Sequence, residues 1–421
     1  MNLLYTVLYS VLMLLALPYF LVIGLLQGKY LSSFGQRLGF IRQRSGEPSC
    51  WIHAVSVGEL LAAKPLIKRL REEYPALPLY LSTTTITGQK LASALLPDRT
   101  FYFPFDWRWC IRKVFARLQP SLILILETEI WPNFLREARK NHIPVLLING
   151  RLSDRSFARY RLFRRWLPHF DEALMQSEED AIRMRALGAC DENVEIMGNL
   201  KFDFQPPILP PELRNLLERW KTSSLLWIAG STMSGEEPLV LDAFQSLKQE
   251  FGLKLLLAPR HPERLQQIYD LLQKRNVAFV KRSHGKAGEE DVMVLDTMGE
   301  LAGCYQFADV VFVGGTLVAA GGHNPIEPAY YGKAVVTGPY YENFRAIFGE
   351  LKNRNAIVIT SDLRQAIAAL LRDDARRAEI GRHAGEIVRS NAGATQTALE
   401  IIGKHIDAGH LVESRKKLLV R

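Results

Sequence analysis

Short apolar runs alternate with segments of helical period along most of the chain. In the first half, we expect strands at 51–55, 79–84, 100–105, 122–127, 145–149, 173–176 and 194–197. Patterns of helical spacing lie between them, for example over 59–73, 107–118, 132–140 and 178–187. This alternation predicts a parallel sheet with helices on both faces.

A proline-rich stretch interrupts the alternation at 204–213, where the sequence is FQPPILPPEL. Proline continues neither a helix nor a central strand, so the stretch is typical of a stiff linker. Strands are expected again at 225–229, 254–258, 278–280, 292–295, 310–313, 334–337 and 357–359. The tail over 363–406 has a mostly helical pattern.

The predicted fold class is therefore α/β, with two doubly wound Rossmann-like domains. We expect the first domain over 29–204, a linker over 205–222 and the second domain over 223–421, including the C-terminal helices. Open α/β sheets bind their ligands beyond the carboxyl ends of the strands. The sequence thus predicts a central cleft that both domains face.

The first 28 residues contain no charged residue and no histidine. As a helix, residues 3–26 are long enough to cross a hydrocarbon core about 30 Å thick. Lys29, Arg37 and Arg42 follow, and the positive-inside rule then places the rest of the chain in the cytoplasm. Pro18 and three tyrosines also suit a helix that lies in the membrane interface. Residues 1–28 are therefore expected to anchor the protein to a membrane, either as a helix that spans the bilayer or as one that lies in its interface.

Composition narrows the class of protein. Of 421 residues, 48% are hydrophobic and 23% are charged, a globular balance that disfavours wholesale disorder. The net charge of +9 favours anionic partners. The four cysteines include no C-x-x-C pair, so neither a disulfide framework nor a structural zinc site is expected. Without a P-loop, an early G-x-G-x-x-G, an H-E-x-x-H or a D-x-D pair, we expect no metal and no cofactor.

Three motifs of the first half carry acidic or basic side chains that are candidates for chemistry. In WIHAVSVGEL, Glu59 opens a helix after a strand, which suits a general base but equally a capping box with Ser56. In LILILETEIWPN, period two puts Glu127 and Glu129 on one face of a strand end, as a carboxylate pair or a solvated edge. In GNLKFD, Lys201 follows a strand just before the linker; a simply solvated lysine is the alternative.

Arginines dominate the segment that follows the fifth predicted strand. They are Arg151, Arg155, Arg159, Arg161, Arg164 and Arg165. Interleaved aromatic residues make the segment amphipathic, which suits anionic lipid or phosphate. Nucleic acid would use the same residues, and a solvated helix face is a further alternative.

Three loops of the second half directly follow strands and carry arginine, glycine or polar residues. In chain order the candidate residues are Pro259, Arg260, Met298, Gly299, Glu300, Asn324, Pro325, Ile326 and Glu327. Glycines before a helix expose backbone N–H groups that bind phosphate, and Arg260 can clamp an anion with two hydrogen bonds. We expect the three loops to form one pocket.

Taken together, these motifs resemble the bacterial 3-deoxy-D-manno-octulosonic acid (Kdo) transferases. The matching stretches are SVGE at 56–59, ETEIWPN at 127–133, GNLKFD at 198–203, PRHPER at 259–264, DTMGEL at 296–301 and GGHNPIEP at 321–328. The resemblance covers nearly the whole chain, and the chain departs from the family's usual residues at Met233 and Gly150. It implies an inverting GT-B glycosyltransferase on the cytoplasmic face of the inner membrane. Such an enzyme transfers Kdo from CMP-Kdo to a lipid A precursor in lipopolysaccharide biosynthesis.

The resemblance also implies roles for residues. Glu59 would be the base, Glu127 and Lys201 would stabilise the transition state, and the three loops would bind CMP. The expected partners are CMP-Kdo, the lipid A precursor and the inner membrane. Arg151, Arg155 and Arg159 are expected to contact the acceptor or the membrane. No nucleic acid is expected as a partner. Two other functions stay open: a GT-B glycosyltransferase or epimerase that uses a UDP-sugar, and a non-catalytic protein that binds anionic lipid or RNA.

Overall fold

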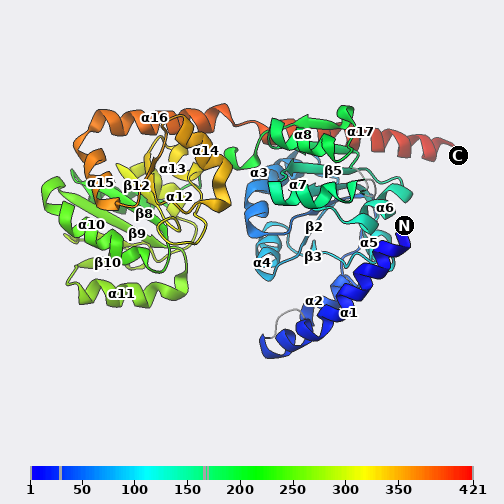
Figure 1. Ribbon diagram of the computed structural model, residues 1–421, viewed down its shortest axis with the longest axis horizontal. Coiled ribbons are helices and arrows are strands. Elements are labelled where there is room, and N and C mark those ends of the chain that lie inside the picture. Colours follow the sequence, from blue (N-terminus) through cyan, green and yellow to red (C-terminus); the bar gives the residue numbers. More distant parts are fainter. Residues whose placement is uncertain (1, 28–30, 165–166, 168–169, 420–421) are drawn as a thin grey trace. The chain divides into compact units, whose positions relative to one another are not determined.

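The computed structural model describes residues 2–27, 31–164, 167 and 170–419. The chain folds into two compact units (Figure 1). Unit 1 comprises Met1–Asp203 together with Ala392–Arg421, and unit 2 comprises Phe204–Asn391. The switch between units after Asp203 agrees with the boundary that the prolines predict.

Unit 1 is built on a seven-stranded sheet in the order β3-β2-β1-β4-β5-β6-β7, and every neighbouring pair is parallel. The strands are β1 (Ser49–His53), β2 (Leu79–Thr83), β3 (Thr100–Tyr102), β4 (Pro120–Leu126), β5 (Val145–Gly150), β6 (Glu172–Met175) and β7 (Val194–Ile196). All strands expected in this half are confirmed. Near-continuous apolar runs form them because both faces of a parallel sheet are covered.

Helices cover both faces of this sheet. They are α1 (Asn2–Gln27), α2 (Leu31–Arg37), α3 (Val57–Glu73), α4 (Ile86–Leu95), α5 (Arg108–Leu118), α6 (Pro132–Lys140), α7 (Asp154–Arg161), α8 (Glu178–Ala186), the short η3 (Leu200–Phe202) and α17 (Ala394–Leu419). Two separate cores result. Cys50 and Ile52 of β1 pack into one core, whereas Trp51 between them packs into the other, as the two-residue period of a strand requires.

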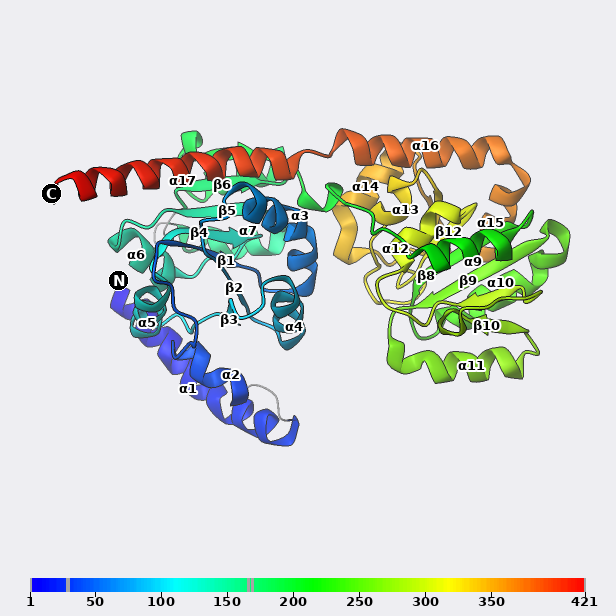
Figure 2. The same cartoon turned by 180° about the vertical axis from the view of Figure 1, so that it is seen from behind.

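The C-terminal helix α17 belongs to unit 1 and not to the second domain, so the predicted extent of that domain to residue 421 is wrong. Ala398 and Ile402 of α17 are buried in the same core as Leu60 of α3, and the two helices pack together (Figure 2). Asp203 accepts a hydrogen bond from Gly393 N at 2.6 Å at the start of this helix. Periodicity predicts the helix but not the core that receives it.

Unit 2 carries a second parallel sheet in the order β10-β11-β9-β8-β12-β13-β14. Its strands are β8 (Leu225–Thr232), β9 (Leu253–Pro259), β10 (Phe279–Lys281), β11 (Val292–Val294), β12 (Val310–Val313), β13 (Ala334–Thr337) and β14 (Val358–Ile359), again where they are expected. Its helices are α9 (Pro211–Lys221), α10 (Glu236–Phe251), α11 (Leu265–Lys274), α12 (Leu301–Cys304), α13 (Ile326–Tyr330), α14 (Arg345–Asn353), α15 (Leu363–Arg372) and α16 (Asp374–Ser390). The predicted linker over 205–222 is too long, because α9 buries Leu213, Leu217 and Trp220 in unit 2.

The expected membrane anchor forms one long helix, α1. Among the residues that the structure describes, no helix has both the length and the apolar character needed to cross a membrane. One side of α1 is docked on unit 1 through polar groups: the Tyr5 hydroxyl donates to Asp106 Oδ2 at 2.8 Å, and Trp107 Nε1 donates to Ser10 Oγ at 2.9 Å.

Candidate active site

Glu59 lies in the first turn of α3, just beyond the carboxyl end of β1. Its Oε1 accepts a hydrogen bond from the Ser56 hydroxyl at 2.8 Å, and its Oε2 accepts one from Val55 N at 2.7 Å. Ser56 Oγ accepts from Glu59 N at 3.3 Å and caps α3, while the carboxylate binds the N–H of Val55 and not that of Ser56, a variant of the predicted capping box. The cap and a chemical role do not exclude each other, since the cap holds the carboxylate in one place.

Burial is the main cause that raises the pKa of Glu59 from 4.5 to about 7, and the charge of Glu127 adds to it. Hydrogen bonds from Val55 N and Ser56 oppose the rise. A carboxyl group whose pKa lies near neutrality is suited to accept a proton during turnover at that pH.

This pKa predicts the pH dependence of the reaction. A base must be ionised to act, so kcat/KM should rise with pH through a limb centred near 7 and level off above it. The measurement is kcat/KM between pH 5 and 9 at constant ionic strength. A limb centred near the ordinary carboxyl value of 4.5, with a plateau through pH 7, would contradict the assignment of Glu59.

Glu127 directly follows β4 and has a φ of 53°, in the left-handed region. Non-glycine residues held there are strained and occur often at functional sites. Its Oε1 lies 3.9 Å from Lys201 Nζ. The two-residue period does not explain how Glu127 and Glu129 come together, because the strand ends at Leu126; the turn after it places both charges close enough to raise the pKa of Glu59.

Three side-chain amides hold the segment of Lys201 in place. Asn199 Oδ1 accepts from Lys201 N, and Asn149 Oδ1 accepts from Leu200 N, each at 3.0 Å. Gln176 links the two residues: its Oε1 accepts from the Asn199 side-chain Nδ2, and its Nε2 donates to the backbone carbonyl of Asn149, again at 3.0 Å. These three residues were not predicted from the sequence, although each amide lies at or just after the end of one of three consecutive strands, β5, β6 and β7.

The arginine-rich segment lies against the loop that carries the two glutamates. Burial raises the pKa of Glu129, and the charge of Arg159 lowers it, so Arg159 is close to this carboxyl group. Thr128 Oγ1 donates to Arg151 O and accepts from Arg151 N, the latter at 3.0 Å. The structure thus brings Arg151 and Arg159 to the candidate site.

The outer face of the same segment is exposed and mixed in character. Arg155, Arg161 and Arg164 are exposed, and so are Leu162 and Phe163 beside them. Arg165 lies outside the described residues. An exposed face with both arginines and large apolar side chains is typical of surfaces that meet anionic lipid.

In unit 2, the first and third predicted loops meet. Arg260 follows β9, and its charge lowers the pKa of both His323 and Glu327. Burial brings the pKa of His323 down to about 4, so the imidazole is neutral at pH 7. Burial raises the pKa of Glu327 to about 7, opposed by the Asn324 amide, which donates to Glu327 Oε1 at 3.3 Å. Pro325 and Ile326 form the buried turn between Asn324 and Glu327.

The second predicted loop is built differently. Glu300 Oε1 accepts from Arg282 at 3.0 Å, and both side chains are mostly buried, so this carboxylate already has a cationic partner. Met298 is 74% exposed, and Gly299 has a φ of +83° with open space where a Cβ would lie. That this loop forms one pocket with the other two stays a prediction.

A buried carboxylate fills the anion-binding turn that the glycines after β12 predict. Glu236 is fully buried and accepts from Gly315 N at 2.7 Å and from Thr316 N and Leu317 N at 2.9 Å. It also accepts from Met233 N at 2.8 Å. These N–H groups are therefore not available to a phosphate. The glycines after β12 instead allow the backbone to bind the carboxylate of Glu236.

Replacing Glu236 with glutamine should destabilise unit 2 by roughly 2–4 kcal/mol, because an amide NH₂ would face backbone N–H donors that have lost their acceptor. Urea unfolding measures the change. Glu250→Gln is the matched control, since this residue lies on the same helix with a side chain 48% exposed, and it should stay within about 0.5 kcal/mol. A loss in Glu236→Gln no larger than in this control would contradict the account.

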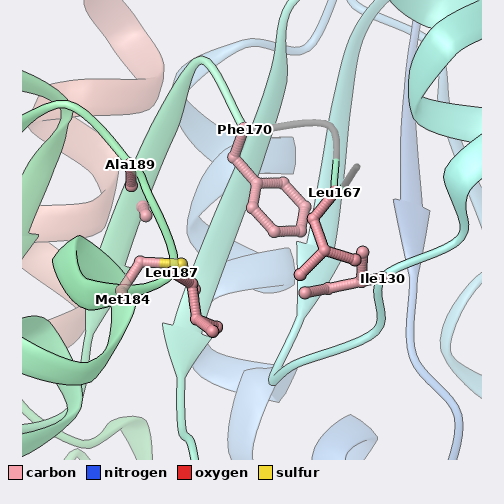
Figure 3. Close-up of a pocket in the computed structure, with 7 residues that line it drawn as sticks. Ile130, Leu167, Phe170, Met184, Leu187 and Ala189 are labelled. Carbon is pink, nitrogen blue, oxygen red and sulfur yellow. The ribbon is translucent and has the colours of Figure 1, made fainter. Parts of the chain in front are cut away.

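A small cavity lies near the candidate site of unit 1 (Figure 3). Its lining comes from Ile130, Leu167, Phe170, Ala173, Met184, Leu187 and Ala189. Most of these side chains belong to the core or pack against it, and the lining has no polar side chain that could orient a sugar. The cavity is a gap in the packing of the core.

The class of protein follows from the fold. The structure matches that of a putative UDP-N-acetylglucosamine 2-epimerase from Listeria monocytogenes, with a TM-score of 0.57, 12% identity and coverage of 86% of this chain and 98% of that one. It also matches a glycosyltransferase from Rickettsia africae, with a TM-score of 0.53, 11% identity and coverage of 86% and 99%. Two parallel α/β units of this kind define the GT-B fold.

Similarity in sequence identifies the family more closely than the fold does. The family model described as 3-deoxy-D-manno-octulosonic-acid transferase (kdotransferase) matches residues 32–204. The 3-deoxy-D-manno-octulosonic acid transferase of Haemophilus influenzae is 35% identical over 419 residues, which cover 95% of this chain and 98% of that protein. The chain belongs to the Kdo transferase family of glycosyltransferases.

Proposed function

We propose that this protein transfers Kdo from CMP-Kdo to a hydroxyl group of a lipid A precursor, in the synthesis of the lipopolysaccharide core. The observation that carries the proposal is the similarity to a Kdo transferase over 95% of this chain and 98% of the relative, which spans both units. The acid cluster of unit 1 and the arginine–histidine–glutamate cluster of unit 2 supply the chemistry that such a transfer needs.

The proposed reaction is a single displacement with inversion. Glu59 takes the proton of the acceptor hydroxyl, and the oxygen forms a bond to the anomeric carbon of Kdo from the face opposite CMP. The bond from that carbon to the phosphate oxygen breaks, and CMP leaves with the electron pair. Glu127 and Lys201 stabilise charge at the reacting centre, and Arg260 stabilises the departing phosphate.

The nucleotide is proposed to bind at the loops of unit 2. Arg260 suits the phosphate because a guanidinium pairs with two oxygens at once. His323, neutral at pH 7, and Glu327, largely buried, offer uncharged or weakly charged hydrogen-bonding groups for the nucleoside. Pro259, Asn324, Pro325 and Ile326 shape the same place, and the loop at 298–300 is assigned to it by family resemblance.

The acceptor is proposed to approach unit 1 from the cytoplasmic face of the inner membrane. Arg151, Arg155 and Arg159 suit the anionic groups of a phosphorylated glycolipid. Leu4, Leu8, Leu12 and Leu15 of α1 are all at least 57% exposed, on the side away from the polar contacts with unit 1. Such a helix suits attachment in the interface of the bilayer.

Competition between nucleotides tests the proposal. CMP should displace a fluorescent cytidine nucleotide from the purified protein and should inhibit transfer, whereas UMP and UDP should do so far more weakly. Preference for a uridine nucleotide would instead favour a UDP-sugar enzyme. Binding of lipid or RNA that falls steeply with salt, without any nucleotide binding, would favour a non-catalytic binding protein.

A further inference from the structure

The last residue of the ETEIWPN motif has no part in the chemistry proposed above. Asn133 is the last residue of that motif and the second residue of α6, and only 1% of it is exposed. The N-cap of α6, Trp131, makes no capping hydrogen bond with its side chain. The first N–H groups of a helix need acceptors, so the cap of α6 must come from elsewhere.

Asp106 supplies this cap from another part of the chain. Its Oδ2 accepts from Asn133 N at 3.0 Å and its Oδ1 from Phe134 N at 2.8 Å. Its backbone carbonyl accepts from Asn133 Nδ2 at 2.7 Å. Asp106 is fully buried, and burial raises its pKa to about 6 despite these hydrogen bonds. A buried carboxylate with this many donors fixes the start of α6 tightly.

The same carboxylate also binds the N-terminal helix. The Tyr5 hydroxyl donates to Asp106 Oδ2 at 2.8 Å, and Asp106 N donates to the Tyr9 hydroxyl at 3.2 Å. Thr6 Oγ1 accepts from Asn133 Nδ2 at 3.1 Å. Tyr5 and Tyr9 of α1 therefore contact Asp106, which caps α6, and Thr6 contacts Asn133 at the start of that helix.

We propose that the contact of α1 with Asp106 and Asn133 is a latch that positions the Glu127–Asn133 loop, so that docking of the N-terminal helix sets the turnover rate and not only the location of the enzyme. This inference rests on the proposed function, because the loop matters through Glu127 and Glu129. Asp106 and Tyr5 are positioning residues and touch no substrate.

The loop between β4 and α6 is held at both of its ends. Glu127 is pinned at one end of the loop, where its N–H donates to Ile148 O at 2.9 Å. The other end begins α6, and the latch is its polar attachment to α1 and Asp106. If the latch loosens, α6 and the loop shift together. The side chains of Glu127 and Glu129 then move with the loop, although the Glu127 N–H keeps its strand contact. Misplacement of catalytic groups by about 1 Å costs up to ~100-fold in rate.

The test uses the full chain in mixed detergent micelles, with CMP-Kdo and a tetraacyl lipid A precursor as substrates, so that membrane attachment is not limiting. Tyr5→Phe removes one hydroxyl group and should lower kcat ~10-fold with little change in KM for CMP-Kdo. Asp106→Asn should lower kcat further. Tyr74→Phe also removes one tyrosine hydroxyl, at the C-cap of α3, so it is the matched control and should keep the kcat of the parent chain.

If Tyr5 and Asp106 only stabilised the fold, their variants would lose folded protein but keep the kcat of the protein that remains folded. Rates are therefore expressed per folded protein, with the folded fraction taken from circular dichroism at the assay temperature. An unchanged kcat per folded Tyr5→Phe protein would overturn the latch, whether or not Asp106→Asn folds. The proposed function fails separately, if the parent chain itself forms no product.

Discussion

Glu59→Gln should reduce transfer by ~10²–10⁴-fold, the usual cost of losing a general base. Glutamine has nearly the same shape and still offers an oxygen to Val55 N, which donates to Glu59 Oε2 at 2.7 Å in the native protein. Its amide cannot take up a proton from the acceptor hydroxyl. The chemical step is therefore lost while the fold and the helix cap are kept.

The experiment measures kcat with CMP-Kdo and a tetraacyl lipid A precursor, alongside calorimetric binding of CMP. CMP affinity should be unchanged, because Glu59 is assigned to the acceptor and not to the nucleotide. Glu72→Gln makes the same chemical change on the same helix, at a side chain 59% exposed, and should behave as the parent protein. Turnover in Glu59→Gln within about threefold of the Glu72→Gln control would remove Glu59 as the base.

Lys201→Met should lower kcat by roughly 10²-fold, the order of loss seen when one electrostatic group of a transition-state site is removed. The ammonium group lies 3.9 Å from Glu127 Oε1, and its side chain is only 19% exposed. Methionine keeps most of the aliphatic volume and leaves the charge of Glu127 without this cation. The loss should appear in kcat more than in KM for either substrate.

Lys201→Arg separates charge from shape, since it keeps the cation on a longer, planar group and should recover part of the lost rate. Lys68→Met, at a side chain 62% exposed on α3, is the control for removal of a lysine. Equal activity of Lys201→Met and Lys68→Met would show that Lys201 has no role in turnover.

The layers of the fold could be predicted from the sequence because each depends on local pattern. Fully buried parallel strands require apolar runs, and the runs at 122–127 and 310–313 lie where β4 and β12 form. What the pattern could not predict is which core receives α17, since Ala398 and Ile402 suit any apolar surface. That choice depends on contacts hundreds of residues apart in the chain.

In the candidate site, too, local motifs could be predicted and contacts between distant residues could not. Glu59 could be located because a capping box is a local motif. The role of Glu236 could not be predicted, because three of the N–H groups that it binds belong to Gly315, Thr316 and Leu317, at least 79 residues further along the chain. The glycines after β12 predict backbone N–H groups that bind an anion. These groups do bind one, but it is the carboxylate of Glu236 and not a phosphate. At position 150, a Cβ would lie 2.6 Å from Met175 Sδ, so the packing here favours glycine.

The most direct test of the account is the product itself. Purified protein is incubated in detergent with CMP-Kdo and a tetraacyl lipid A precursor, and the lipid is analysed by mass spectrometry. We expect an acceptor heavier by one or more Kdo residues, with one CMP released for each. An acceptor of unchanged mass, from protein that is folded and binds CMP, would contradict the account.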